Sequence, residues 1–331
     1  MSGLLTTLLL SGCEAGMDRL IAWELKKLYD DTPLTDGGLH VIFGGTGTLS
    51  SDRDRAGASV AIVAGGEIFV VDAGPGSTRV LASSRVPLSA ISTVLLTHVH
   101  SDHYGDLGEL TIASEVNGRV EPLTLYGPPG VGRIAAGFEM AYAADHANRA
   151  AQHPGNLHPE NASYTVHELE SVEGLTPIFS RDGVEVSVFE VDHRPVEPAL
   201  GYRISYGGRT VVVSGDTAYY EPLSEYAKGA DLLIHEAMDK AFAVRVADIS
   251  REIGQERTAV LIEDALPNHS TPEDAARIAH AAGVEQLALT HISPPLITPM
   301  LRRQFLQSAR EIFDGEVVLA EDGDWIDLEG R

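Results

Sequence analysis

The stretch THVHSDH, residues 97–103, places several metal-binding side chains directly after an apolar run. They are His98, His100, Asp102 and His103. Imidazole nitrogens and carboxylate oxygens are the ligands that zinc and similar divalent ions accept. Alternate residues of an extended chain point the same way, so His98 and His100 can share one ion. If the chain then turns, Asp102 and His103 can face a second ion, and the stretch therefore predicts a dinuclear metal site.

Short apolar runs, separated by Gly and Pro, predict strands on both sides of this stretch. The runs cover residues 40–43, 59–63, 68–71, 91–97, 184–191, 200–206, 210–214, 231–235 and 286–290. Gly65-Gly66 and Gly207-Gly208 are expected at hairpin turns. Helices are expected at residues 132–149 and after Thr271, with Thr271 as N-cap and Gly283 just past the end. Strands and helices in both halves predict an α/β fold.

The 331 residues show no Pro-, Gly- or Ser-rich linker, which predicts one domain at residues 37–331. Residues 14–36 are expected to form a helical extension whose apolar side chains pack on that domain. These side chains are Leu20, Ile21, Trp23, Leu25 and Leu28. The chain carries 48 Asp and Glu against 24 Lys and Arg, a net charge of -24. Such a charge repels a phosphate backbone and argues against a nucleic-acid partner.

The only cysteine, Cys13, excludes an internal disulfide and a cysteine-rich zinc site. It follows a short apolar run and ends the quartet LSGC, which resembles a bacterial lipobox. Residues 1–13 are therefore expected to be a lipoprotein signal, and the protein an exported periplasmic or cell-envelope lipoprotein. Its membrane contact would be this lipid anchor alone. The alternative is a cytosolic protein with a frayed apolar N-terminus.

The order and spacing in residues 97–103 resemble the His-x-His-x-Asp-His signature of the metallo-β-lactamase superfamily. Further stretches, each at the end of an expected strand, resemble the motifs of its ribonuclease Z branch in the same order. They are Asp192-His193, Ser214–Thr217, His235–Ala237, His269–Thr271 and Leu289–Pro294. The resemblance implies a four-layer αββα sandwich with two metal ions between the loop ends of two facing sheets.

The resemblance also implies a role for each matching residue. Metal one would be held by His98, His100 and His193, metal two by Asp102, His103 and His291, and Asp216 would bridge the two ions. Zinc is the expected metal, with manganese or iron(II) as alternatives. Two such ions lower the pKa of a shared water, so that a bridging hydroxide can attack an ester and the protein would be a hydrolase. Asp102 could also hold the proton of the nucleophile.

Three further residues are candidates for supporting roles. Asp72 either supports the ligand loops or is a structural turn aspartate. His269 stands before a helix N-terminus, where the helix dipole opposes formation of imidazolium. By the resemblance, His269 would hydrogen-bond a developing oxyanion or protonate a leaving group, and Glu236 would orient it.

Two features favour a small substrate over tRNA. Residues 201–216 form one tight hairpin, where ribonuclease Z usually carries a long tRNA-binding arm, and the chain is acidic overall. The segment 141–149, with His153, instead resembles exported relatives of the arylsulfatase type. Arg149 could clamp a sulfate or phosphate oxygen, or pair with Asp145 at helical spacing.

The expected substrate is therefore a small anionic ester, either an aryl sulfate or a phosphodiester, and a nucleic-acid substrate is disfavoured. The alternatives are tRNA 3′ processing, as in ribonuclease Z, and hydrolysis of a β-lactam or lactone. A non-catalytic binding protein of the same fold is disfavoured because it should lack one or more of the metal ligands. The family further suggests a homodimer.

Overall fold

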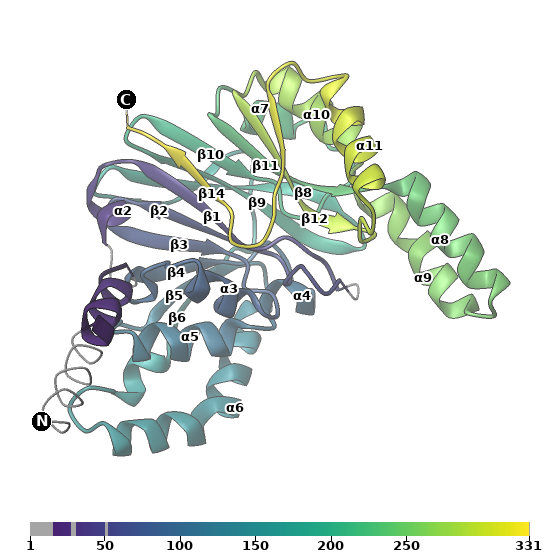
Figure 1. Cartoon of the computed structure of the whole chain (residues 1–331). Helices are drawn as coiled ribbons and strands as arrows, with labels where there is room; N and C mark the ends of the chain where they lie inside the picture. The colour runs from purple at the N-terminus through teal and green to yellow at the C-terminus, as the bar shows by residue number, and fades with distance from the viewer. Residues whose placement is uncertain (1–15, 28–30, 50–51, 331) are drawn as a thin grey trace, which may run out of the picture.

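Two seven-stranded sheets face each other, and helices cover their outer sides (Figure 1). The computed structural model describes residues 16–27, 31–49 and 52–330. The expected signal at residues 1–13, with Cys13, lies outside the described residues. The first sheet has the order β14-β1-β2-β3-β4-β5-β6 and the second β13-β12-β11-β10-β9-β8-β7. The predicted α/β fold, a four-layer αββα sandwich, is confirmed.

The elements of the first half belong to the first sheet and its helices. The strands are β1 (Leu39–Gly45), β2 (Ser59–Ala64), β3 (Glu67–Val71), β4 (Ile91–Leu95), β5 (Leu123–Gly127) and β6 (Tyr164–Glu168), joined by β14 (Trp325–Leu328) from the C-terminus. The helices are α2 (Thr32–Thr35), α3 (Ser77–Ser83), α4 (Ser101–Tyr104), α5 (Leu107–Val116) and α6 (Val131–Gln152), with 3-10 turns at Leu88–Ala90 and Pro159–Ala162.

The second sheet and its helices follow in the chain. The strands are β7 (Thr176–Arg181), β8 (Val184–His193), β9 (Val196–Tyr206), β10 (Arg209–Val213), β11 (Leu232–Met238), β12 (Gln286–Ser293) and β13 (Glu316–Leu319). The helices are α7 (Leu223–Tyr226), α8 (Lys240–Glu252), α9 (Glu256–Ala265), α10 (Pro272–Ala282) and α11 (Pro299–Arg310), with the 3-10 turn η3 at Leu266–Asn268.

Three hydrophobic clusters account for the four layers. The central cluster joins the inner faces of both sheets, for example Phe69 and Tyr202. A second cluster packs α3, α5 and the start of α6 on the first sheet. A third packs α7, α10 and α11 on the second sheet. Since apolar burial is the main driving force of folding, both sheets are held by a core on each face.

The local signals in the sequence describe the turns and caps correctly. Gly65 and Gly66, between β2 and β3, have φ of +61° and +82°, the region that glycine adopts readily. Thr271 caps α10 in a capping box with Asp274, and Gly283 ends the helix with φ +65°. Strand β4 is shorter than expected and ends at Leu95. It ends early because the backbone N–H of Thr97 donates to the Asp72 carboxylate instead of a neighbouring strand.

The N-terminal extension differs from the expectation. Residues 16–27 are helical, but their apolar side chains remain about half exposed, with Trp23 at 51% and Leu20 at 53%. Leu28 lies outside the described residues. The stripe stays uncovered because the outer faces of both sheets already carry helices of their own. Within the described residues, no helix combines the length and the apolarity that crossing a membrane requires.

His40 of β1 is buried and links the segment before β1 to the neighbouring strand β14, and its contribution to stability should depend on pH. Its Nδ1 lies 2.7 Å from Asp327 and its Nε2 lies 3.0 Å from Asp36. Burial alone would lower the pKa of His40, but the two carboxylates together raise it. A raised pKa in the folded state means that stabilisation is complete below the unfolded pKa of about 6.5. It is lost as the pH rises through the folded pKa.

We expect His40→Gln to destabilise the fold by roughly 1 kcal/mol at pH 6, since both carboxylates are partly exposed and screened. The difference from wild type should shrink as the pH is raised to 9, because His40 loses its proton as the pH passes the folded pKa. Urea unfolding at both pH values measures this. A difference that stayed constant with pH would show that the contribution of His40 is packing alone.

Candidate metal centre

The first four candidate ligands follow β4 and lie at one end of the first sheet. Beyond Leu95 the chain leaves the strand and bends at Val99, and His100 is again extended, with φ and ψ of -81° and 145°. The short helix α4 then turns the chain, so that Asp102 and His103 face inward and are buried. His98 is fully buried. The predicted change from extended chain to turn is therefore present.

The other three candidate ligands come from the second sheet. His193 is the last residue of β8, and Asp216 follows the end of β10. His291 lies within β12, which continues three residues beyond the expected end at residue 290. Its φ is +49°, a conformation that is uncommon for residues other than glycine. The backbone of the next residue, Ile292, is held in place because its N–H donates a hydrogen bond of 2.9 Å to the Thr46 carbonyl.

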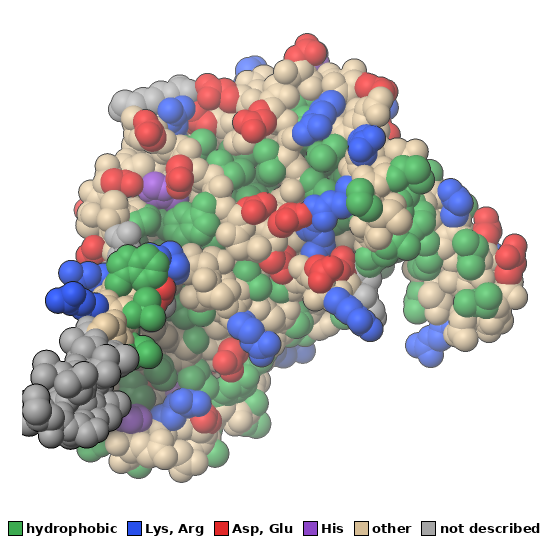
Figure 2. All heavy atoms as spheres, viewed as in Figure 1, with side chains coloured by type: hydrophobic (Ala, Val, Ile, Leu, Met, Phe, Trp, Pro, Cys, Tyr) green, Lys and Arg blue, Asp and Glu red, His purple; other side chains and the backbone are tan. Residues whose placement is uncertain are grey.

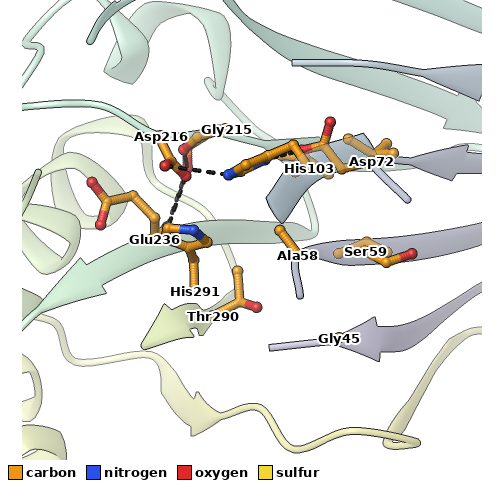
Figure 3. A pocket seen from close by; sticks show the side chains of 14 residues that line it. Gly45, Ala58, Ser59, Asp72, His103, Gly215, Asp216, Glu236, Thr290 and His291 are labelled. Carbon is orange, nitrogen blue, oxygen red and sulfur yellow. Dashed lines mark hydrogen bonds and ion pairs between the residues drawn. The ribbon is translucent and has the colours of Figure 1, made fainter. Parts of the chain in front are cut away.

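All seven predicted ligands meet in one cluster between the sheets. The groups whose ligand atoms lie within 4.8 Å of one another include His98–His100–His193, His98–His103–Asp216 and Asp102–His103–His291. Asp216 contacts two of the other ligands. Its Oδ2 is 3.4 Å from His103 Nε2, and its Oδ1 is 3.4 Å from His291 Nδ1. Figure 3 shows both contacts as dashed lines.

Unpartnered nitrogens show that this cluster suits metal ions. Among the described residues, His103 Nε2 and both ring nitrogens of His291 are buried without a hydrogen-bond partner. A buried polar atom without a partner costs free energy, so native proteins rarely retain one unless it has a function. Five imidazoles and two carboxylates are also a donor set that zinc and similar ions accept. The arrangement is consistent with a dinuclear metal site.

The charge state of the carboxylates also favours cation binding. Burial alone would raise the pKa of Asp102, but the nearby imidazoles of His291 and His103 lower it to about 2. Burial likewise opposes ionisation of Asp216, but His291 and His103 hold its pKa well below the usual value. Both side chains are therefore ionised at neutral pH, as metal ligands must be.

Asp72 fixes the orientation of a ligand. Its Oδ2 accepts hydrogen bonds of 2.8 Å from Thr97 Oγ1 and from His103 Nδ1, and its Oδ1 accepts one from the Thr97 backbone. With Nδ1 of His103 donating to Asp72, the other ring nitrogen faces the cluster. The structure thus places Asp72 where support of the ligand loops was expected, at a turn position with φ +59°.

We expect Asp72→Ala to weaken metal binding about 10- to 100-fold, because His103 would lose the partner that orients it. Equilibrium dialysis with zinc measures the affinity directly. Asp314→Ala is the matched control, since this carboxylate is exposed. If the Asp72 variant bound zinc with unchanged affinity, the role of Asp72 would be limited to stabilising the turn.

Two supporting groups were missed by the sequence analysis. Thr97 Oγ1 lies 3.0 Å from His98 Nδ1, and the backbone carbonyl of Asn268 accepts a hydrogen bond of 3.0 Å from His193 Nδ1. The position of Thr97 directly before His98 was an available signal. No sequence pattern indicates Asn268, because its contribution is a backbone atom.

His269 and Glu236 lie at the edge of the cluster and contact each other. Glu236 Oε1 accepts from His269 Nδ1 at 3.2 Å and from the Ser270 N–H at 2.9 Å. Burial alone would lower the pKa of His269, but the charge of Glu236 raises it to about 9. The helix dipole opposes formation of imidazolium, but the contact with the Glu236 carboxylate favours it. A cationic His269 can donate a proton.

Arg149 and His153 lie outside this cluster. Arg149 Nε is 2.7 Å from Asp145 Oδ2, and both side chains are exposed on α6. The contact is thus the helical ion pair that was the alternative to a substrate clamp. His153 follows the last residue of α6 and is exposed. Neither residue belongs to a metal-binding group or lines the pocket around Asp216.

Comparison with known proteins identifies the family. The family model described as "Beta-lactamase superfamily domain" matches residues 68–292. Ribonuclease Z of Mycobacterium avium (strain 104) is 39% identical over 281 residues, covering 84% of this chain and 94% of the relative. The chain belongs to the metallo-β-lactamase superfamily, in its ribonuclease Z branch. Ribonuclease Z of Mycobacterium bovis (strain BCG / Pasteur 1173P2) is 36% identical over 287 residues, covering 86% and 96% of the two chains.

Solved structures agree with this assignment. The short form of human tRNase Z superposes with a TM-score of 0.62 at 25% identity, covering 87% of this chain and 99% of that one. The metallo-β-lactamase fold protein YhfI from Bacillus subtilis gives a TM-score of 0.58 at 22% identity, covering 88% and 99%, and supports the fold alone.

The expectation that nucleic acid is an unlikely partner was wrong. The relatives that match this chain over most of its length are named ribonuclease Z, and an acidic net charge did not keep the chain out of that branch. Net charge is summed over the whole protein, whereas a bound phosphate group responds to the electrostatic field at its own site. The net charge therefore does not decide whether the site accepts a phosphate. Divalent metal ions carry the largest charges in such a site, and they can make the local electrostatic potential positive although the protein as a whole is negative.

Proposed function

We propose that this protein is a metal-dependent phosphodiesterase of the ribonuclease Z type, an endoribonuclease that removes the 3′ trailer from precursor tRNA. The observation that carries the proposal is the complete cluster: seven converging metal ligands beside the His269–Glu236 pair. The 39% identity to ribonuclease Z over 84% of the chain supports the substrate class. An RNA substrate also favours the cytosolic of the two expected locations.

Each residue of the cluster has a role in this proposal. His98, His100 and His193 would hold one ion, Asp102, His103 and His291 the other, and Asp216 would contact both. When bound, divalent ions such as zinc lower the pKa of water and neutralise the charge of the phosphodiester. Asp102, ionised and directed into the cluster, accepts the proton of the attacking water.

His269 completes the proton balance. Because Nδ1 is held by Glu236, the other ring nitrogen is available to the substrate. As water oxygen bonds to phosphorus and the bond to the leaving oxygen breaks, His269 supplies the proton that this oxygen needs. Glu236 keeps the imidazole cationic and in place. Three backbone and side-chain donors hold Glu236 Oε1 itself, so the pair is preorganised.

The test is incubation of zinc- or manganese-loaded protein with a precursor tRNA that carries a 3′ trailer, with the products resolved by gel and sequenced. We expect cleavage at one position at the end of the acceptor stem, and turnover of bis-p-nitrophenyl phosphate. p-Nitrophenyl sulfate and nitrocefin test the aryl sulfate and β-lactam alternatives. Turnover of either of these with intact precursor tRNA would overturn the proposal.

A further inference from the structure

A second pocket lies where the helix of residues 16–27 meets the end of α3. This cavity of about 270 Å³ is lined by Lys27, Pro33, Ser84, Arg85 and Trp325. They come from the helix of residues 16–27, from α2, from the end of α3 and from β14. None of them is a candidate metal ligand or lines the pocket around Asp216. The cavity is close to the lower limit of about 300 Å³ for sites that bind small molecules.

Arg85 has a backbone conformation that residues other than glycine rarely adopt. Its φ is +64°, in the left-handed region. The Arg85 N–H donates to the Ala82 carbonyl and the Val86 N–H to the Leu81 carbonyl, which are the two bonds of a Schellman motif that ends α3. Glycine is the usual residue here, because a Cβ atom disfavours the left-handed conformation. Residues held in such a conformation cluster at functional sites, so the Arg85 side chain is a candidate ligand contact.

Two cations line this pocket, and no carboxylate does. Within the described part of the chain, neither Arg85 nor Lys27 forms an ion pair. The chain has 48 acidic and only 24 basic side chains, so two unpaired cations in one cavity are contrary to its composition. Like charges that line one cavity repel each other, and an anion between them removes this repulsion. The charges therefore favour an anionic ligand.

Both tryptophans of the chain stand at this pocket. Trp325 lines it and is partly buried against the hydrophobic cluster on the outer side of the first sheet. The Lys27 ammonium lies over the ring of Trp23, which remains half exposed. At the position of the helix of residues 16–27, Figure 2 shows blue Lys and Arg side chains around green hydrophobic ones. The pocket thus combines positive charge with a flat apolar wall.

This combination fits a nucleotide. A guanidinium such as that of Arg85 binds a phosphate by two parallel N–H···O bonds, and the Lys27 ammonium and the Ser84 hydroxyl supply further donors. The Trp325 indole can stack with any base, because every base has a π-face. An inorganic anion would use the cations but would leave the tryptophan wall without a partner.

We propose that this pocket binds one nucleotide, with the phosphate between Arg85 and Lys27 and the base on Trp325. Either a free mononucleotide or the 5′-phosphorylated end of an RNA strand presents this chemistry. The pocket binds the nucleotide without cleaving it, since the metal cluster lies elsewhere. The proposal is therefore independent of the hydrolytic activity.

The first experiment follows tryptophan fluorescence while adenosine 5′-monophosphate is added to the zinc-loaded, full-length protein. Trp23 and Trp325 are the only tryptophans, so the signal reports on this pocket rather than on the metal cluster. We expect a saturable change with a dissociation constant below roughly 1 mM, and at least about tenfold weaker binding of adenosine and of inorganic phosphate. A response that does not saturate, or phosphate bound as tightly as the mononucleotide, would overturn the proposal.

The second experiment replaces Arg85 by glycine, which removes the guanidinium and the unfavourable conformation together. We expect Arg85→Gly to raise the dissociation constant of adenosine 5′-monophosphate at least about tenfold. Its melting temperature should be no lower than that of the wild type, so the loss is not due to unfolding. Lys27→Ala should weaken binding in the same way, because it removes the other cation. An unchanged dissociation constant in both variants would contradict the proposal.

Arg79→Ala is the matched control, since Arg79 is exposed on the same helix and does not line the pocket. It should bind the mononucleotide as the wild type does, and all three variants should keep full turnover of bis-p-nitrophenyl phosphate. Competition with a short single-stranded RNA distinguishes the two sources of the ligand. Displacement of the mononucleotide only by RNA with a 5′-phosphate indicates a strand end, and no displacement indicates a free mononucleotide. Equal displacement by RNA with a 5′-hydroxyl would show that the pocket does not recognise a terminal phosphate, against the proposal.

Discussion

The Asp216→Asn variant is expected to bind neither metal ion firmly and to lose at least about 10³-fold in turnover of bis-p-nitrophenyl phosphate. The two oxygens of Asp216 lie 3.4 Å from His103 and from His291, so this carboxylate serves both halves of the cluster. Asparagine keeps the shape but removes the negative charge and replaces one acceptor by a donor. Metal content by mass spectrometry and steady-state kinetics measure the two losses.

The control for this variant is Asp314→Asn, which changes an exposed carboxylate by the same atoms. It should retain full metal content and turnover. An Asp216→Asn protein that bound two ions per chain and kept a tenth of the activity would contradict the central position that we assign to this residue.

The His269→Ala variant is expected to lose about 10²- to 10⁴-fold in kcat on precursor tRNA with little change in KM. The reason is that a ribose oxygen is a poor leaving group and needs the proton that His269 supplies. p-Nitrophenolate leaves as a stable anion, so the loss on bis-p-nitrophenyl phosphate should be much smaller. The ratio of the two losses separates proton donation from a structural role.

His280→Ala is the matched control, because His280 is exposed on α10. It should leave both substrates unaffected. Equal losses on the two substrates in His269→Ala would indicate that the imidazole orders the metal cluster rather than protonating the leaving oxygen.

Local patterns predicted an α/β fold and a metal site after the apolar run that ends before His98, whereas the four-layer sandwich and the full set of seven ligands were implied by the resemblance of the ordered motifs to a family. The ligands stand at strand ends, and the capping box at Thr271 and the glycine pair at residues 65–66 define their elements without tertiary information. The left-handed conformation of His291 could not be predicted in this way. It depends on the contact between Ile292 and Thr46, which lie far apart in the chain.

The remaining differences have a common physical origin. The apolar stripe of residues 16–27 has helical periodicity, but periodicity does not tell which surface is free to receive such a stripe. The nucleic-acid exclusion failed similarly, because -24 is a sum over 331 residues. Both errors concern how segments and charges are arranged in the folded protein, and local sequence patterns do not contain that information.

The division of the ligands between the two sheets has a consequence for folding. His98, His100, Asp102 and His103 follow β4, whereas His193, Asp216 and His291 belong to the second sheet. An ion that needs ligands from both sheets binds only when they are docked, and at 1,000 times its dissociation constant it stabilises the docked state by roughly 4 kcal/mol. The resistance of this protein to proteases in a cell should therefore rise and fall with the free metal supply.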